Sequence, residues 1–302
     1  MSRTVCRPLL LLAILLVLLL AVMSERRASE VAAALADTER TEVKSNGWAR
    51  LKGKVTFDGD PPELDDFRDS MAGNKDKAFC LKGDTEDPTW IVGKDKGVAN
   101  VVVWVRPPKG QYFPIPDDLK KRTDVVKMDQ PYCAFKPHGV VLFPSYWNPR
   151  TGSQERTGQV FKILNSAPIA HNILWSGTPV INSGENVLTP PCKDGKPSEH
   201  VVAARTGRIG REELIHINCN LHLWMRGWAW AFEHPYHALT KTDGTFDIPK
   251  LPAGAEMSLL AWHEGASPQW LLPERRGRRE GIALPPLKDG EVREFNFKVR
   301  KK

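Results

Sequence analysis

Apolar and polar residues alternate in short runs through most of the chain, and glycine, proline, asparagine and aspartate separate these runs. A period of two rather than 3.6 is typical of β-strands with one buried face. The 24 prolines are spread along the sequence and argue against long helices. We therefore predict an all-β protein, with one short helix within residues 60–79. The predicted strands lie at residues 49–57, 97–105, 139–143, 158–165, 170–176, 212–219, 227–234, 244–248, 257–263 and 293–299.

The N-terminal residues form a different pattern. Basic residues precede an unbroken apolar run over residues 8–23, and a pair of arginines follows it. This order is typical of a secretory signal, residues 1–24, and is also compatible with an uncleaved membrane anchor. Both interpretations place the body of the protein outside the cytoplasm, in the periplasm or cell envelope, with membrane contact only through this segment. Residues 25–47 are polar and rich in alanine and glutamate, and we predict a linker there.

The charge and the sequence motifs exclude several functions. The formal charge of +7 reflects 43 Lys+Arg against 36 Asp+Glu, and the dense basic runs are residues 273–281 and 298–302. Aromatic residues do not interleave these runs, as they would in a platform for single-stranded nucleic acid, so we expect no nucleic-acid partner. The chain also has no G-x-S-x-G, no H-E-x-x-H and no phosphate-binding glycine loop. The sequence therefore favours a non-enzymatic function.

Beyond the leader there are four cysteines, at positions 80, 133, 192 and 219. An even number of cysteines in an exported protein is most simply explained by two disulfides. One hypothesis pairs Cys80 with Cys133. The alternative is a Cys192–Cys219 disulfide, and Cys219 can bind a metal only if this disulfide is absent.

The stretch "HINCNLHLWMRG", residues 216–227, places Cys219, His222 and Met225 three residues apart after a predicted strand. Thiolate, imidazole and thioether are soft or borderline ligands, and two histidines, one cysteine and a weak axial methionine form the trigonal blue-copper arrangement. The second histidine must come from a neighbouring strand, and "NSAPIAHNILW" offers His171. Cysteine and histidine ligands also accept zinc, whereas the order of affinities favours copper.

Around residues 130–235 the chain resembles the cupredoxins, the plastocyanin and amicyanin family. These proteins share an N-x-x-x-x-x-H-N segment and a later C-x-x-H-x-x-M loop. The resemblance implies a Greek-key β-sandwich or barrel in which Asn172 ties the two ligand loops together. It implies these ligands for one copper ion: His171, Cys219, His222 and, more weakly, Met225. With "DQPYCAFKPHGVV" and "EHPYHALTKTDGTF", the chain is similar to exported bacterial proteins of this kind, some labelled methylamine-utilisation-like.

A second resemblance involves both ends of the body. "LKGKVTFDGDPPE", "KGVANVVVWVRPP" and the hairpin Thr240–Gly254 are similar to a carboxypeptidase regulatory-like (transthyretin-like) β-sandwich. In that family these pieces are nearly contiguous, whereas here a long segment separates them. We predict a cupredoxin-like domain, 124–236, that is inserted in or packed beside a sandwich formed by 48–123 and 237–302.

Other histidines and the tryptophans have competing interpretations. His138 in "CAFKPHG" is a candidate extra ligand, alone or with Cys133, and His216 could alter the ligand set. Four residues are interpreted as strand ends at a domain junction, with metal or ligand binding by the last two as the alternative: His234, His237, His263 and Glu264. Five tryptophans are interpreted as packing residues rather than sugar-stacking platforms: Trp104, Trp175, Trp228, Trp230 and Trp262.

The leading functional hypothesis is single-electron transfer with a redox partner protein such as a cytochrome. Electrons would leave through His222, whose ring edge we expect near a surface patch. The expected apolar docking contacts are Leu221, Leu223 and Trp224. The alternatives are copper binding without redox work, which predicts a solvent-open site, and a carbohydrate- or surface-binding β-sandwich with structural cysteines.

Overall fold

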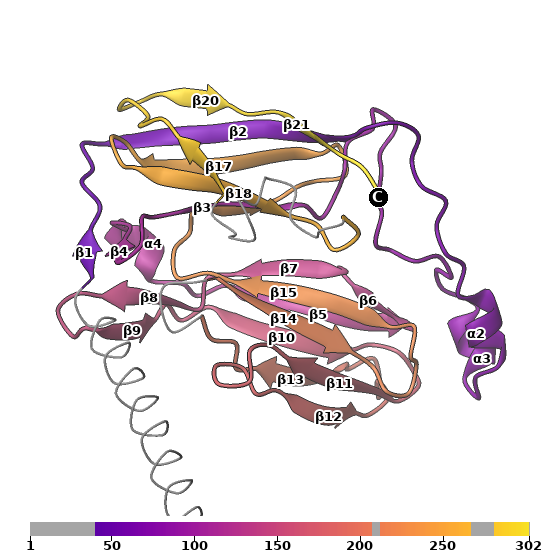
Figure 1. The fold of residues 1–302 in the computed structure, drawn as a ribbon. Coiled ribbons are helices and arrows are strands. Elements are labelled where there is room, and N and C mark those ends of the chain that lie inside the picture. Colours follow the sequence, from indigo (N-terminus) through magenta and orange to yellow (C-terminus); the bar gives the residue numbers. More distant parts are fainter. Residues whose placement is uncertain (1–39, 207–211, 267–280, 302) are drawn as a thin grey trace, which may run out of the picture.

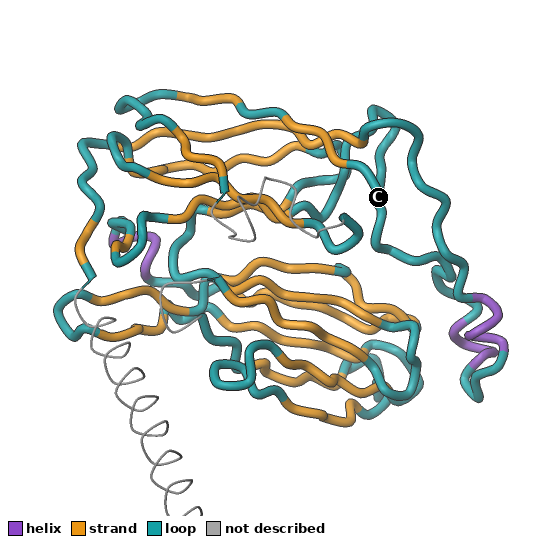
Figure 2. The backbone as a smooth tube through the Cα atoms, viewed as in Figure 1, coloured by secondary structure: helices purple, strands orange, loops and turns teal. Residues whose placement is uncertain are grey.

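The computed structural model of the protein describes residues 40–206, 212–266 and 281–301. Strands account for most of the regular structure in these ranges, so the prediction of an all-β fold is confirmed (Figures 1 and 2). Within them, no helix has both the length and the apolar character needed to cross a membrane. The predicted leader, most of the predicted linker and nearly all of the basic run 273–281 lie outside the described residues.

Two sheets form the upper half of the molecule in Figure 1. One has the order β17-β2-β20, with β21 also paired to β2, and the other has the order β16-β3-β18-β19. The strands of the first sheet are β2 (Trp48–Phe57), β17 (Thr245–Pro252), β20 (Val292–Glu294) and β21 (Phe297–Val299). Those of the second are β3 (Val102–Arg106), β16 (His237–Leu239), β18 (Met257–Trp262) and β19 (Ile282–Leu284). This pairing brings strands from both ends of the body into one sandwich.

Two further sheets form the lower half (Figure 1). Their orders are β12-β11-β14-β15-β7 and β13-β10-β5-β6. The strands of the first are β7 (Gly139–Leu142), β11 (His171–Ser176), β12 (Glu185–Thr189), β14 (Glu213–Asn218) and β15 (Arg226–Ala231). Those of the second are β5 (Val125–Tyr132), β6 (Ala134–Lys136), β10 (Val160–Asn165) and β13 (Ser198–Val202). The candidate ligands lie on β11 and on the loop between β14 and β15.

Three apolar cores separate the four sheets, so the two inner sheets are buried on both faces. On β3, Val103 belongs to the upper core, whereas Trp104 belongs to the core between the two halves. On β15, Ala229 belongs to the lower core, whereas Trp228 and Trp230 face the middle one. These strands are therefore apolar at nearly every position rather than at alternate ones. The interpretation of the tryptophans as packing residues is confirmed for these three and for Trp175 and Trp262.

Smaller elements complete the described chain. β8 (Ser145–Asn148) pairs with β9 (Ser153–Arg156), and α4 (Asp117–Lys120) is a single short helix. The segment 40–47 is not the structureless linker that the sequence predicts, because β1 (Thr41–Glu42) pairs with β4 (Gln111–Tyr112). Arg40 also forms a buried ion pair with Glu233. These contacts attach the N-terminal end of the described chain to both halves.

After β2 the chain leaves the upper sandwich and reaches the end of the lower one (Figure 1). There it forms two short helices, α2 (Arg68–Ala72) and α3 (Lys77–Cys80), where the sequence predicts one. Met71 and Cys80 are buried in the lower core. We call residues 67–87 the cap, because this segment covers the candidate metal centre.

Candidate metal centre

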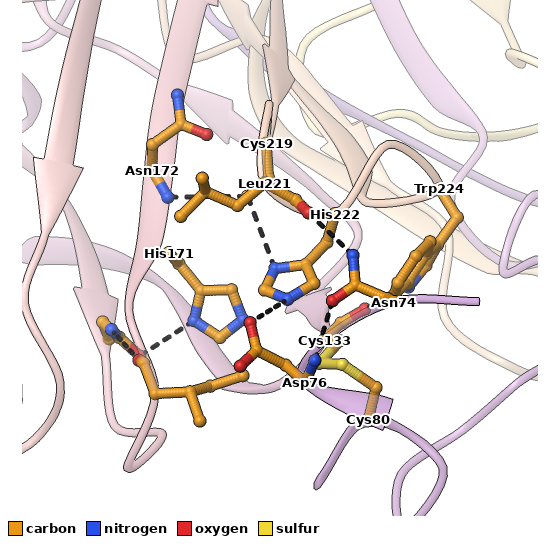
Figure 3. Close-up of polar contacts among 12 residues, drawn as sticks. Asn74, Asp76, Cys80, Cys133, His171, Asn172, Cys219, Leu221, His222 and Trp224 are labelled. Carbon is orange, nitrogen blue, oxygen red and sulfur yellow. Dashed lines mark hydrogen bonds and ion pairs between the residues drawn. A yellow bond between two sulfur atoms is a disulfide. The ribbon is translucent and has the colours of Figure 1, made fainter. Parts of the chain in front are cut away.

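The register of the strands brings His171 next to the loop that contains Cys219 and His222. Leu174 of β11 pairs with Asn218, the last residue of β14. His171, the first residue of β11, therefore lies beyond the end of β14, where the 219–225 loop begins. The same loop returns to the sheet at Arg226, which pairs with Asn218. Figure 3 shows the resulting group of side chains.

Hydrogen bonds close this loop and connect it to β11. The amide of Cys219 donates to the carbonyl of Met225 at 3.2 Å, and the amide of Met225 donates to the carbonyl of His222 at 2.9 Å. The backbone amide of Asn172 lies 3.5 Å from the sulfur of Cys219. The side-chain oxygen of Asn172 accepts from the amide of Asn220. Asn172 thus joins the two segments that carry the candidate ligands.

The two ring nitrogens of His222 face different partners. Nε2 lies 3.2 Å from Oδ2 of Asp76, and Nδ1 lies 3.8 Å from the sulfur of Cys219. A carboxylate only accepts hydrogen bonds, so the ring proton belongs on Nε2. The lone pair on Nδ1 is therefore directed toward Cys219.

Asn165 orients His171 in the same way, but with the opposite tautomer. The amide nitrogen of Asn165 donates to the carbonyls of Ile169, Thr189 and Pro190, which identifies the other side-chain atom as the oxygen. This oxygen lies 3.1 Å from Nδ1 of His171, so Nδ1 carries the proton. The lone pair of His171 is then on Nε2, which is buried and has no hydrogen-bond partner among the described residues. The rings of His171 and His222 lie 4.8 Å apart, centroid to centroid.

Burial favours the uncharged form of all three donor groups at neutral pH before any metal binds. Burial lowers the pKa of His171 to about 3, with a smaller contribution from His222. Burial also lowers the pKa of His222, although Asp76 opposes this shift. Burial raises the pKa of the Cys219 thiol, against hydrogen bonds from backbone amides that favour the thiolate. Metal binding would therefore displace one proton from sulfur and none from the imidazoles.

These residues fit a soft or borderline metal ion. Nδ1 of His222 lies 3.8 Å from a buried sulfur, and the ring of His171 lies 4.8 Å from that of His222, centroid to centroid. Nε2 of His171 has no hydrogen-bond partner in the part of the chain that the structure describes. A buried polar atom without a partner destabilises the folded protein, and coordination of a metal ion would give Nε2 of His171 a partner. Met225 is 2% exposed and packs in the same core as Cys219. Its role as a fourth ligand stays a prediction.

The cap is joined to the candidate centre by the Cys80–Cys133 disulfide, a pairing that the sequence suggested, and by contacts that the sequence did not indicate. Cys80 of α3 forms a disulfide with Cys133, and the ligand-type atoms of these cysteines and of His222 all lie within 4.8 Å of one another. The side chain of Asn74 donates to the carbonyl of Leu221 at 3.1 Å. The expectation that the His222 ring edge lies near the surface is wrong, because the cap covers it and leaves His222 0% exposed.

The structure places the remaining sequence candidates away from the metal centre or changes their environment. Cys192 and Cys219 are free, so the alternative of a disulfide between them is wrong. Nε2 of His138 lies 2.5 Å from Oε1 of Glu264, and His216 is exposed beside an open pocket that Glu264 also lines.

Among the expected docking residues, Leu223 is 84% exposed. Leu221 and Trp224 are half-buried against the lower core, and the Trp224 indole donates to the carbonyl of Cys133 at 3.0 Å.

No family model and no curated relative matches the chain. Solved structures similar to it include a reduced Cu(I) form of an amicyanin variant at pH 4, with 12% identity and a TM-score of 0.23 over 36% of this chain and 84% of that one. A second amicyanin variant, also with Cu(I), has 12% identity and a TM-score of 0.23, over 42% of this chain and 97% of that one. A third is auracyanin A, a "blue" copper protein from the green thermophilic photosynthetic bacterium Chloroflexus aurantiacus. It has 14% identity and a TM-score of 0.22, over 36% of this chain and 98% of that one. These neighbours are cupredoxins. The candidate metal centre is indicated by the side chains of this chain and not by these neighbours.

Proposed function

We propose that this chain binds one copper ion through Cys219, Nδ1 of His222 and Nε2 of His171, with Met225 as a weak fourth ligand, and exchanges single electrons. The observation that carries the proposal is the pair of opposite tautomers. Asp76 and Asn165 each hold the proton on one nitrogen of an imidazole ring, so that Nδ1 of His222, which lies beside Cys219, and Nε2 of His171 keep their lone pairs for a metal. A bound copper ion would supply a reversible one-electron couple.

Rigid ligands support electron transfer over metal storage or delivery. Non-redox copper binding predicts a solvent-open site, whereas His171 and His222 are completely buried and Cys219 is 2% exposed. Cys219 and His222 are fixed by the hydrogen bonds of a short loop, and His171 is fixed by Asn165. Ligands held in this way change position little between two oxidation states of a metal, which keeps the reorganisation small.

The carbohydrate-binding alternative has less support. Its stacking platforms would be exposed aromatic faces, whereas Trp104, Trp228 and Trp262 are buried between the inner sheets. Cys219 is also a free thiol rather than part of a structural disulfide. An exported copper protein with an unidentified redox partner therefore remains our proposal, with export through the N-terminal segment.

The direct test is to load the purified protein with Cu(II) and to record its visible absorption and copper content. We expect one copper ion per chain and an intense thiolate-to-copper charge-transfer band that ascorbate removes and reoxidation restores. Zinc should bind at the same site without colour and should reduce the copper stoichiometry. A protein that binds no copper, or binds it without the band, would contradict the proposal.

A further inference from the structure

The cap has a charged side chain in direct contact with a candidate ligand. Asp76 lies at the N-terminus of α3, where an aspartate side chain commonly accepts a hydrogen bond from the helix backbone. Here its side chain makes no such bond, and Oδ2 instead lies 3.2 Å from Nε2 of His222. The carboxylate is 21% exposed, whereas the ring that it contacts is 0% exposed. Figure 3 shows Asp76 on the side of His222 opposite Cys219.

The position of Asp76 is fixed by the rest of the cap. The disulfide joins Cys80, four residues after Asp76, to Cys133 in the lower sandwich. Asn74, two residues before Asp76, donates to the carbonyl of Leu221 in the ligand loop and accepts from the amide of Asp76. Anchors on both sides of Asp76 therefore hold its carboxylate against the ring. This arrangement has the form of a carboxylate–histidine–metal triad, in which the carboxylate sets the tautomer and the basicity of the ligand.

We propose that Asp76 is a positioning residue of the metal centre, an inference that rests on the proposed function. It acts through His222: it keeps the proton on Nε2, directs Nδ1 toward the metal, and places a negative charge beside the ligand. A negative charge in a buried site stabilises the more highly charged metal, so Asp76 favours Cu(II) over Cu(I). The cap also separates His222 from solvent, so a redox partner must approach the centre by another route than the edge of this ring.

The test compares three variants of the whole chain. Asp76→Asn removes the charge with almost no change of shape, and Asp76→Glu retains it. Asp84→Asn is the matched control, because Asp84 is an exposed carboxylate of the same cap that pairs with Lys136 rather than with His222. The first measurement needs no metal: NMR of the imidazole nitrogens in the metal-free protein gives the tautomer of His222. We expect the Nε2-protonated form alone in the wild type and in Asp84→Asn, and a mixture of tautomers in Asp76→Asn.

The second measurement is the affinity for Cu(II) and for Cu(I), with the midpoint potential. We expect Asp76→Asn to lose about tenfold to a hundredfold in Cu(II) affinity, to lose less in Cu(I) affinity, and to have a higher potential. Asp76→Glu should restore most of the preference for Cu(II). If Asp76→Asn matches Asp84→Asn in tautomer and potential, the inference is wrong although the copper site stands. If the wild type has no thiolate-to-copper band, the proposed function fails, and the tautomer measurement alone decides whether Asp76 positions His222.

Discussion

The side-chain oxygen of Asn165 accepts a hydrogen bond from Nδ1 of His171, at 3.1 Å. Asn165 is the last residue of β10, and His171 is the first residue of β11, so one side chain connects the two sheets of the lower sandwich at the candidate metal centre. The asparagine is itself held by three carbonyl groups and by the amide of Ala167. It thereby fixes both the position and the tautomer of a candidate ligand.

The first prediction concerns this asparagine. Asn165→Ala should lower copper affinity by about tenfold to a hundredfold, because Nδ1 of His171 loses the acceptor that holds its proton. It should also destabilise the fold by about 1–3 kcal/mol, because buried backbone groups lose their partner. Copper titration and urea unfolding measure the two effects.

The control for this prediction is Asn182→Ala. Asn182 is also buried, and its side chain bonds both backbone groups of Arg205, outside the metal centre. This variant should lose stability by a comparable amount and retain the wild-type copper affinity. Equal losses of copper affinity in the two variants would show that Asn165 acts on stability alone.

The second prediction concerns the disulfide that anchors the cap. Replacing Cys80 and Cys133 together by serine removes a crosslink between residues 53 apart in the sequence and should cost about 2–4 kcal/mol. It should also speed the removal of copper by a chelator, because Asp76 and Asn74 lose their covalent support. The chelation rate is followed through the charge-transfer band. Unchanged rates would mean that the cap does not limit access to the metal.

Local spacing alone indicated part of the candidate metal centre. Cys219 and His222 lie on one short loop, and His171 begins a strand, so their types and order indicate a metal site without any knowledge of the fold. Asp76 could not be identified in this way, because it is 146 residues from His222 and belongs to a polar segment with no motif. The hypothesis of a Cys80–Cys133 disulfide connected this segment with Cys133 but not with the candidate ligands.

The prediction of strands from the sequence was limited in the same way, because it used only local patterns. Each predicted strand overlaps an observed one, because each has one or both faces in an apolar core. Several short strands were missed, and so were β12 and β13, which are edge strands with mostly exposed or half-buried residues. β5 was missed as well, although it lies inside its sheet, because Asp129, Gln130 and Pro131 interrupt its apolar pattern. The stacking of four sheets depends on contacts between distant segments, which alternation along the chain does not encode.

The third prediction concerns pH. Burial lowers the pKa of His171 and His234 to about 3 and that of His263 to about 4. In the unfolded chain these groups titrate near their ordinary value of about 6.5. Between about pH 6.5 and about pH 4 the unfolded state therefore binds more protons than the folded state. The free energy of unfolding then falls as the pH falls, by at most about 1.4 kcal/mol per pH unit for each histidine.

Urea unfolding of the metal-free protein between about pH 7 and about pH 5 measures this dependence. His234→Gln removes one of the buried histidines, whose Nδ1 accepts from the amide of Tyr236, and lies outside the metal centre. This variant should show a shallower decrease of stability toward acid than the wild type. Stability that stays constant over this pH range would contradict the assignment of buried neutral histidines.

The central claim is that Cys219 supplies the thiolate of a copper site, and the chain contains its own control. Cys219 and Cys192 are both free, but only Cys219 lies beside His222. The decisive measurement is the visible absorption of Cu(II)-loaded Cys219→Ser and Cys192→Ser. We predict that the charge-transfer band disappears in Cys219→Ser and is unchanged in Cys192→Ser. A full band in Cys219→Ser would contradict the account.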